Sequence, residues 1–182
     1  DDGADIIDGG SNAETNGDTV DYSAISKSIN VTLNGSTNAT VQITDYSNDT
    51  IKNIENVIGS SVDDIINGDS NKNTLSGSLG NDTLYGAGGN DTLDGGDGID
   101  TADYTNARNG RIVVDLSNTS AEVSNDGDSS SDDLISIEKV IGSTFGDIMS
   151  GNDSSNTLYG GAGSDTISGG LGADDLKGYG LS

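Results

Sequence analysis

Isolated apolar residues recur at every ninth position in two parts of the chain. From residue 59, and again from residue 142, each nine-residue unit begins with Gly, carries Asp or Asn in sixth place and an apolar residue in eighth place. Strand side chains alternate between two faces, so the end of each unit predicts a short strand with only the eighth side chain inside. The eighth residues are Ile66, Leu75, Leu84, Leu93, Ala102, Met149, Leu158, Ile167 and Leu176. No window shows the apolar period of a helix. The pattern therefore predicts an all-β fold, with a thin aliphatic ladder between two short parallel sheets.

A longer repeat lies over the nine-residue one. The segment 54–60 returns as 137–143, and the segment 73–75 returns as 156–158, both at a shift of 83. The segment 18–23 corresponds to 100–105 at a shift of 82. A chance echo in low-complexity sequence is the alternative, and the coincidence of three motifs speaks against it. We expect about two modules of a longer repetitive protein, with neighbouring repeats as partners.

The segments between the nine-residue blocks have a different pattern. They carry alternating stretches such as Ile29–Leu33 and Arg111–Leu116, which predict short strands joined by Asn, Asp, Gly and Ser turns. We therefore expect the end of a nine-residue block at 1–21, a β connector at 22–58, a block at 59–104, a connector at 105–141 and a block at 142–182.

The charge changes the picture, because it excludes several classes of function. The chain has 31 acidic and 7 basic side chains, a net charge of −24, and only 30% hydrophobic residues. Direct binding to nucleic acid or to an anionic membrane is excluded, since little positive charge is available for phosphate. With no Cys and no His, thiol nucleophiles, histidine-based triads and soft-metal sites are excluded as well. No apolar run reaches the roughly 18 residues of a membrane span, so no membrane insertion is expected.

Most of the acidic residues are Asp, placed among Gly and Asn as in tight turns and cation-binding loops. A flexible Gly-Asp linker is the plain alternative, but a linker needs no aliphatic residue at a fixed ninth spacing. If each strand reverses the chain, turns that are two units apart share an edge of the molecule. The stacked sets are then Asp64 with Asp82 and Asp100, Asn73 with Asp91, Asp147 with Asp165, and Asn156 with Asp174. Stacked carboxylates repel unless a cation lies between them, and six to eight oxygen ligands suit Ca²⁺ better than Mg²⁺. Periodic Asp pairs also favour metal-binding loops over one active site, so no enzymatic activity is expected.

The unit Gly-Gly-x-Gly-x-Asp-x-aliphatic-x, seen best at 77–103 and 160–177, resembles the RTX or haemolysin-type calcium-binding nonapeptide. The resemblance implies a right-handed parallel β-roll with several Ca²⁺ ions between successive loops. It implies that the sixth-place carboxylates bind the ions, and these are Asp64, Asp82, Asp91, Asp100, Asp147, Asp165 and Asp174. It also implies that loop carbonyls complete the shell, and these belong to Gly77, Leu79, Gly80, Gly86, Gly88, Gly89, Gly95, Asp97, Gly98, Gly160, Ala162, Gly163, Gly169, Leu171 and Gly172.

Some turns depart from the RTX pattern. Asn73 and Asn156 replace the sixth Asp, which removes a charge, and their loops lack the inner glycines. Val62 and Phe145 stand in fourth place, where the pattern has Gly. These departures put Ca²⁺ binding in question at the start of each block.

The long module is similar to the repetitive RTX regions of large bacterial surface proteins, particularly adhesins exported by type I secretion. The resemblance implies a calcium-binding structural module that folds on Ca²⁺ outside the cell, within a secreted or surface-attached protein. Links like 54–60 also precede RTX repeats in some secreted polysaccharide-modifying enzymes, so the alternative is a carbohydrate-binding accessory module. Tyr85 and Tyr159, each in ninth place, are expected to face outward, where such rings stack on sugars or pack on the sheet. No residue pattern identifies a cell-surface or glycan ligand.

Overall fold

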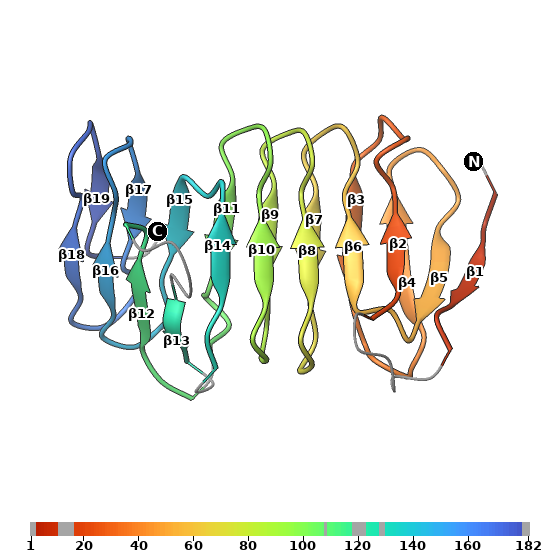
Figure 1. Cartoon of the computed structure of the whole chain (residues 1–182), viewed down its shortest axis with the longest axis horizontal. Helices are drawn as coiled ribbons and strands as arrows, with labels where there is room; N and C mark the ends of the chain where they lie inside the picture. Colours follow the sequence, from red (N-terminus) through yellow and green to blue (C-terminus); the bar gives the residue numbers. More distant parts are fainter. Residues whose placement is uncertain (1–2, 11–16, 108, 118–122, 128–129, 180–182) are drawn as a thin grey trace.

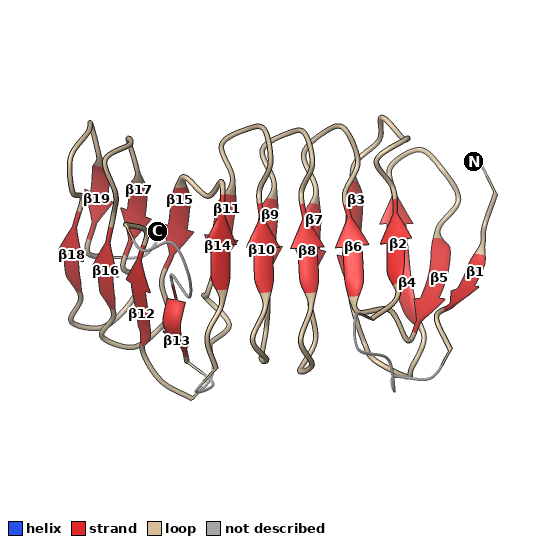
Figure 2. Cartoon of the chain, viewed as in Figure 1, coloured by secondary structure: helices blue, strands red, loops and turns tan. Residues whose placement is uncertain are grey.

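The computed structural model describes residues 3–10, 17–107, 109–117, 123–127 and 130–179. Within these ranges the regular elements are all strands, most of them three residues long, and they form sheets of ten, five and four strands. The sheets lie along one elongated body in which short strands stand side by side (Figures 1 and 2). The expected all-β fold is confirmed.

The largest sheet forms one face of this body along its whole length. Its ten strands, in spatial order, are β1 (Ile6–Asp8), β5 (Asp49–Lys52), β4 (Ala39–Ile43), β3 (Ile29–Thr32), β7 (Ile65–Asn67), β9 (Thr83–Tyr85), β11 (Thr101–Asp103), β15 (Lys139–Ile141), β17 (Thr157–Tyr159) and β19 (Asp175–Lys177).

Two smaller sheets share the opposite face (Figure 1). The five-stranded sheet contains, in order, β14 (Asp133–Ile135), β10 (Thr92–Asp94), β8 (Thr74–Ser76), β6 (Asn56–Ile58) and β2 (Thr19–Asp21). The four-stranded sheet contains, in order, β13 (Val123–Asp126), β12 (Ile112–Asp115), β16 (Ile148–Ser150) and β18 (Thr166–Ser168).

Consecutive nine-residue units send their strands alternately to the two faces. Strands β6, β8 and β10 are parallel neighbours in one sheet, and β7, β9 and β11 are parallel neighbours in the other. Each strand therefore pairs with the strand two units further along the chain, as in the register Thr74↔Thr92. This is a parallel β-roll, in which two units make one turn around the core.

The eighth-place side chains form the expected ladder inside the roll. Leu75 and Leu93 from one sheet and Ile66 and Leu84 from the other are fully buried. The ladder opens at the far end, where Leu176 of β19 is 44% exposed. Within the described chain β19 pairs with β17 alone, so no further turn covers that side chain.

The connectors extend the sheets and widen the core. Strand β4 is antiparallel to both of its neighbours, β3 and β5, and β3 is parallel to β7 in the roll. Strands β12 and β13 are also antiparallel, while β12 is parallel to β16. Apolar side chains from successive connector strands, such as Val31, Val41 and Ile51, are buried together in one hydrophobic core. This core is wider than the single aliphatic ladder of the nine-residue turns.

The roll continues through the segment boundaries that the sequence suggests. Strand β6, at the end of the 22–58 segment, pairs in parallel with β2 and β8. Strand β15, at the end of the 105–141 segment, likewise pairs with β11 and β17. Parts of the 1–21, 105–141 and 142–182 segments lie outside the described residues.

Candidate metal centre

The sixth residue of each unit stands where a turn enters a strand, and its carboxylate reaches back to the preceding turn on the same edge. Asp82 Oδ1 accepts the N–H of Asp64 at 2.7 Å, and Asp100 Oδ1 accepts the N–H of Asp82 at 2.7 Å. On the other edge Asp91 Oδ1 accepts the N–H of Asn73 at 2.8 Å. These bonds bring the predicted carboxylates into stacked rows. The edges and the bonded partners are those predicted for a roll in which two nine-residue units make one circuit.

The second block repeats this arrangement. Asp165 Oδ1 accepts the N–H of Asp147 at 3.0 Å, and Asp174 Oδ1 accepts the N–H of Asn156 at 2.9 Å. In five predicted ligands one carboxylate oxygen thus joins two turns of the backbone, and these are Asp82, Asp91, Asp100, Asp165 and Asp174.

The other carboxylate oxygen lacks a partner in several of these turns. The Oδ2 atoms of Asp82, Asp91, Asp100 and Asp165 are buried and have no hydrogen-bond partner. A buried polar atom without a partner costs about 1–3 kcal/mol, and more when it is charged. A hard cation bound to these atoms relieves that penalty, so the donor set fits Ca²⁺.

Burial also changes the ionisation of these groups. Burial raises the pKa of Asp82 to about 7 and that of Asp91 to about 8. The pKa of Asp100 is raised as well, for the same first cause. A raised pKa means that the fold, without a cation, disfavours the charged carboxylate that Ca²⁺ binds.

Backbone carbonyls lie beside the unpartnered oxygens. A Cβ atom placed on Gly77 would collide with Oδ2 of Asp82 and would lie 2.6 Å from the carbonyl oxygen of Gly95. The first-place glycine therefore faces both a carboxylate and the first-place carbonyl of the next turn on the same edge. Among the described residues no three His, Cys, Asp or Glu side chains converge on one point. An ion in these turns must take most of its oxygens from the backbone.

Gly77→Ala is expected to weaken Ca²⁺ binding, because a methyl group would occupy the space between Asp82 Oδ2 and the Gly95 carbonyl. The Ca²⁺ concentration at half-saturation should rise by about tenfold or more. Gly178→Ala is the matched control, since a Cβ at Gly178 meets no atom within 4 Å. Isothermal titration with Ca²⁺ measures both variants, and equal affinities would contradict this placement of the site.

The predicted carbonyl-bearing residues stand in the first, third and fourth places of the turns. Leu79 and Asp97 form an isolated parallel bridge, which joins two turns of one edge. Leu79 and Leu171 are exposed, so their side chains take no part in the core. Gly80 adopts φ +124°, a conformation that favours glycine. The fourth-place glycines Gly89, Gly163 and Gly172 also have positive φ, whereas Gly98 does not.

Asp64 and Asp147 differ from the other predicted ligands, because both of their carboxylate oxygens have protein donors. Asp64 Oδ1 accepts the N–H of Ile29 at 2.7 Å, and Asp64 Oδ2 accepts the N–H of Ser60 at 2.5 Å. Asp147 has the equivalent donors of the second block. Its Oδ1 accepts the N–H of Ile112 at 2.9 Å, and its Oδ2 accepts the N–H of Ser143 at 2.6 Å.

Four acidic residues outside the nine-residue pattern accept the same kind of backbone N–H bond as the sixth-place carboxylates, and the repeat spacing did not predict them. Glu55 accepts the N–H of Asp18 at 2.8 Å, and Glu138 accepts the N–H of Asp100 at 3.0 Å. Asp49 accepts the N–H of Asp5 at 2.9 Å. The fourth, Asp132, accepts the N–H of Asp91 at 3.1 Å. The connectors therefore extend the carboxylate rows.

Asp132 is the last carboxylate in the row of Asp91, and it also bonds to a buried tyrosine. Its Oδ2 accepts the hydroxyl of Tyr104 at 2.9 Å, and Tyr104 is 1% exposed. Burial raises the pKa of Asp132 to about 7 and raises the pKa of Tyr104 far above its usual value. Tyr22 donates to Asp49 Oδ2 at 3.1 Å in the other module. These two acids have neutral donors where Asp82 and Asp91 have an unpartnered oxygen.

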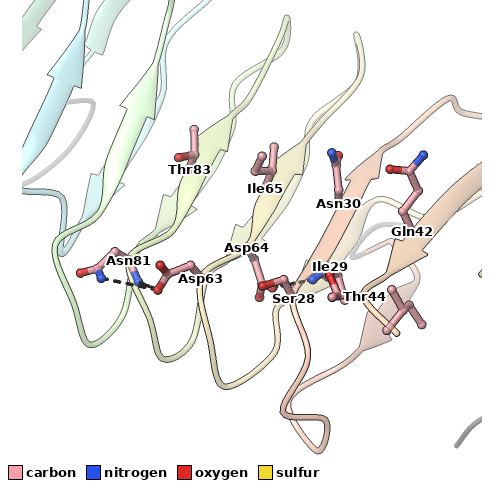
Figure 3. A pocket seen from close by; sticks show the side chains of 11 residues that line it. Ser28, Ile29, Asn30, Gln42, Thr44, Asp63, Asp64, Ile65, Asn81 and Thr83 are labelled. Atoms are coloured by element: carbon pink, nitrogen blue, oxygen red, sulfur yellow. Dashed lines mark hydrogen bonds between the residues drawn. The ribbon is translucent and has the colours of Figure 1, made fainter. Parts of the chain in front are cut away.

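A second row of hydrogen bonds joins the turns on their outer side. Asp63 Oδ1 accepts the N–H of Asn81 at 2.8 Å, and Asn81 Oδ1 accepts the N–H of Ile99 at 3.0 Å. These fifth-place side chains reach forward along the chain, whereas the sixth-place carboxylates reach back. Figure 3 shows Asp63 beside Asn81 and Asp64 beside Ile29. Neighbouring turns are therefore joined twice, in opposite directions.

An open groove of about 620 Å³ lies on the outer face of β4, β3, β7 and β9. Figure 3 shows the side chains that line it. Polar side chains such as Asn30, Gln42 and Thr83 line it together with the exposed Ile65, and none of the lining residues is aromatic. Tyr159, expected as an exposed ring, is 9% exposed, because the Lys177 ammonium lies 4.2 Å from its ring centre. Neither feature offers the flat aromatic surface on which a sugar stacks.

These observations define a class of protein, a parallel β-roll whose glycine-rich turns stack carboxylates for a hard cation. A family model for the RTX calcium-binding nonapeptide repeat, in four copies, matches residues 54–84, 67–102 and 141–176. Residues 54–102 and 141–176 are therefore repeats of the RTX family, a family of nonapeptide repeats that binds Ca²⁺. The predicted family and cofactor are confirmed. No curated protein matches the chain. The part of the chain that the structure describes contains no helix with the length and apolarity of a membrane span.

Proposed function

We propose that the chain is a structural module whose nonapeptide turns fold on binding Ca²⁺ outside the cell, within a longer secreted or surface-attached, adhesin-like protein. The observation that carries this proposal is the set of buried carboxylate oxygens without partners at Asp82, Asp91, Asp100 and Asp165. A turn that buries such a group is incomplete until a cation is bound.

The ions are held by sixth-place carboxylates of the later turns and by backbone carbonyls beside them. The carboxylates are Asp82, Asp91, Asp100, Asp165 and Asp174. First-place carbonyls such as that of Gly95 supply further oxygens. Each ion neutralises part of the net charge of −24 and joins two turns, so its binding energy becomes folding energy.

The cellular setting follows from the usual affinity of such sites. Extracellular calcium modules have dissociation constants of about 10⁻⁴–10⁻³ M, so their sites stay empty in the cytosol and fill outside. Export of an unfolded chain followed by folding on Ca²⁺ fits the type I secretion common to proteins with these repeats.

The carbohydrate-binding alternative gains less support. The groove of Figure 3 has no aromatic lining residue, and the Tyr159 ring is covered by Lys177. No catalytic role is proposed, because the carboxylates are distributed along the roll in stacked rows.

The proposal predicts that calcium removal will unfold the nonapeptide turns. Circular dichroism of the full chain should lose a large part of its β-sheet signal in excess EDTA and recover it when Ca²⁺ is restored. Added Mg²⁺ serves as the control and should not restore the signal, because it prefers a stricter octahedral shell. A β-sheet spectrum that is unchanged by complete calcium removal would contradict the proposal.

A further inference from the structure

The turns of the two blocks fall into two conformational classes. In one class the second residue has positive φ, and the members are Ser78, Ala87, Gly96, Gly161 and Gly170. In the other class the second residue has ordinary negative φ, and the members are Ser60, Asp69, Ser143 and Asn152. We call the first class open turns and the second class closed turns. The closed turns are the first two turns of each block.

Closed turns satisfy their sixth side chain from their own backbone. The N–H of Ser60 donates to Asp64 Oδ2 at 2.5 Å, and the N–H of Asp69 donates to Asn73 Oδ1 at 2.8 Å. In the second block the N–H of Ser143 donates to Asp147 Oδ2 at 2.6 Å. The N–H of Asn152 donates to Asn156 Oδ1 at 2.8 Å. An N–H group is the positive end of a dipole, so it occupies the side of the carboxylate that a cation would need.

The second side chain completes the closed turn. Ser60 Oγ accepts the N–H of Val62 at 3.3 Å, and Ser143 Oγ accepts the N–H of Phe145 at 3.0 Å. Ser60 Oγ also lies 2.9 Å from Asp64 Oδ1. The remaining fourth-place N–H groups, those of Asn71 and Ser154, donate to the second side chain in the same way.

This bonding explains the departures from the RTX pattern. The fourth residue of a closed turn has no positive φ, so Val62 and Phe145 are tolerated where open turns such as 77–82 need Gly80 at +124°. Ser78 shows that a second-place serine alone does not close a turn, because it stands in an open turn with φ +80°. The fourth residue distinguishes the two classes.

We propose that the two closed turns at the start of each block fold without Ca²⁺ and bind none, and that calcium-dependent folding proceeds from them into the open turns. This inference rests on the proposed function. It assigns calcium-dependent folding to the open turns and calcium-independent folding to the closed turns. Open turns bury an unpartnered oxygen at Asp82, Asp91, Asp100 and Asp165, whereas Asp64 has a donor on each oxygen. The first closed turn of each block also leads into a strand that pairs with a connector strand, β7 with β3 and β16 with β12.

Hydrogen exchange of the full chain with and without Ca²⁺ tests this division. We expect calcium removal to abolish amide protection in residues 77–103 and 160–177 and to leave most of it in 56–75. Equal loss in 56–75 and 77–103, reversed by Ca²⁺, would overturn this inference and leave the proposed function standing. Protection that survives everywhere would overturn the proposed function itself.

A gain of calcium dependence provides a second test that does not rely on loss of folding. Ser60→Gly combined with Val62→Gly removes the serine bonds and gives the turn 59–64 the glycines of an open turn. This variant should bind more Ca²⁺ per chain than the parent, and its 56–75 segment should need Ca²⁺ for protection. Ser61→Gly is the matched control, because Ser61 bonds to Ile25 and not to Asp64. An unchanged stoichiometry in the double variant would contradict the inference.

Discussion

Replacing Asp82 or Asp91 with Ala is expected to raise the Ca²⁺ concentration at the folding midpoint by about tenfold or more. Both side chains are almost fully buried, and each has one oxygen that joins two turns and one that has no partner. Alanine removes both functions at once. Because each carboxylate links neighbouring turns of one edge, the loss should also lower the cooperativity of the titration.

Two control variants separate the possible causes. Asp153→Ala removes the same charge from an exposed position in a closed turn and should leave the midpoint unchanged. Asp82→Asn keeps an oxygen that can accept the N–H of Asp64 but removes the charge from the unpartnered position. A midpoint shift in the Ala variant that is absent from the Asn variant would assign the effect to the backbone bond and contradict a ligand role.

Much of the architecture is readable from the sequence, because one spacing determines it. An aliphatic residue at every ninth position defines the inner ladder, and alternation of strands between faces makes two units the period of the roll. The stacked carboxylates follow from that period, as Asp64, Asp82 and Asp100 show. Such contacts are local in the repeat, so they need no knowledge of tertiary packing.

The connectors are less readable, because their contribution depends on three-dimensional stacking. Asp132 reaches the row of Asp91 across 41 residues, and Glu138 reaches Asp100 across 38. Neither acid belongs to a nine-residue unit. The longer module repeat did contain a usable signal, since Asp49 and Glu55 stand at the corresponding positions of the other module. Acidic residues that recur at the module period, outside the nonapeptides, are candidates for such contacts.

The closed turns show why the consensus pattern alone misassigns some residues. By sequence Asp64 and Asp147 are equivalent to Asp82, with the aspartate in the same sixth place. Their bonding differs because the second-place N–H points at the carboxylate, which depends on backbone conformation. The fourth residue carries that information, since it is Gly in all five open turns, with positive φ in four of them, and is not Gly in any closed turn. The resemblance to the family gives the kind of site, and the turn conformation distinguishes one turn from another.

Calcium-depleted protein is expected to regain structure as the pH is lowered from about 8 to about 5. Burial raises the folded-state pKa of Asp82 to about 7 and of Asp91 to about 8, from an ordinary value of 3.8. Because these pKa values are raised, protonation stabilises the fold. That contribution is complete below the ordinary pKa and is lost as the pH rises through the raised folded-state values. At low pH a proton therefore neutralises the carboxylate with the unpartnered oxygen, as a bound cation would.

Circular dichroism of calcium-depleted protein across this pH range measures the effect, and a paired variant tests its cause. Asp82→Asn combined with Asp91→Asn mimics the protonated state at only two of the 31 acidic groups. The total charge repulsion of the chain therefore changes little, and an effect of the variant reports on these two sites. The variant should keep more β-sheet signal than the parent at pH 8 and should depend less on pH. With Ca²⁺ present the parent should behave oppositely, because protons compete with the ion for the same oxygens. The prediction would be contradicted if the β-sheet signal of the calcium-free parent stayed flat or fell toward pH 5. The charge on these carboxylates would then not be what destabilises the open turns.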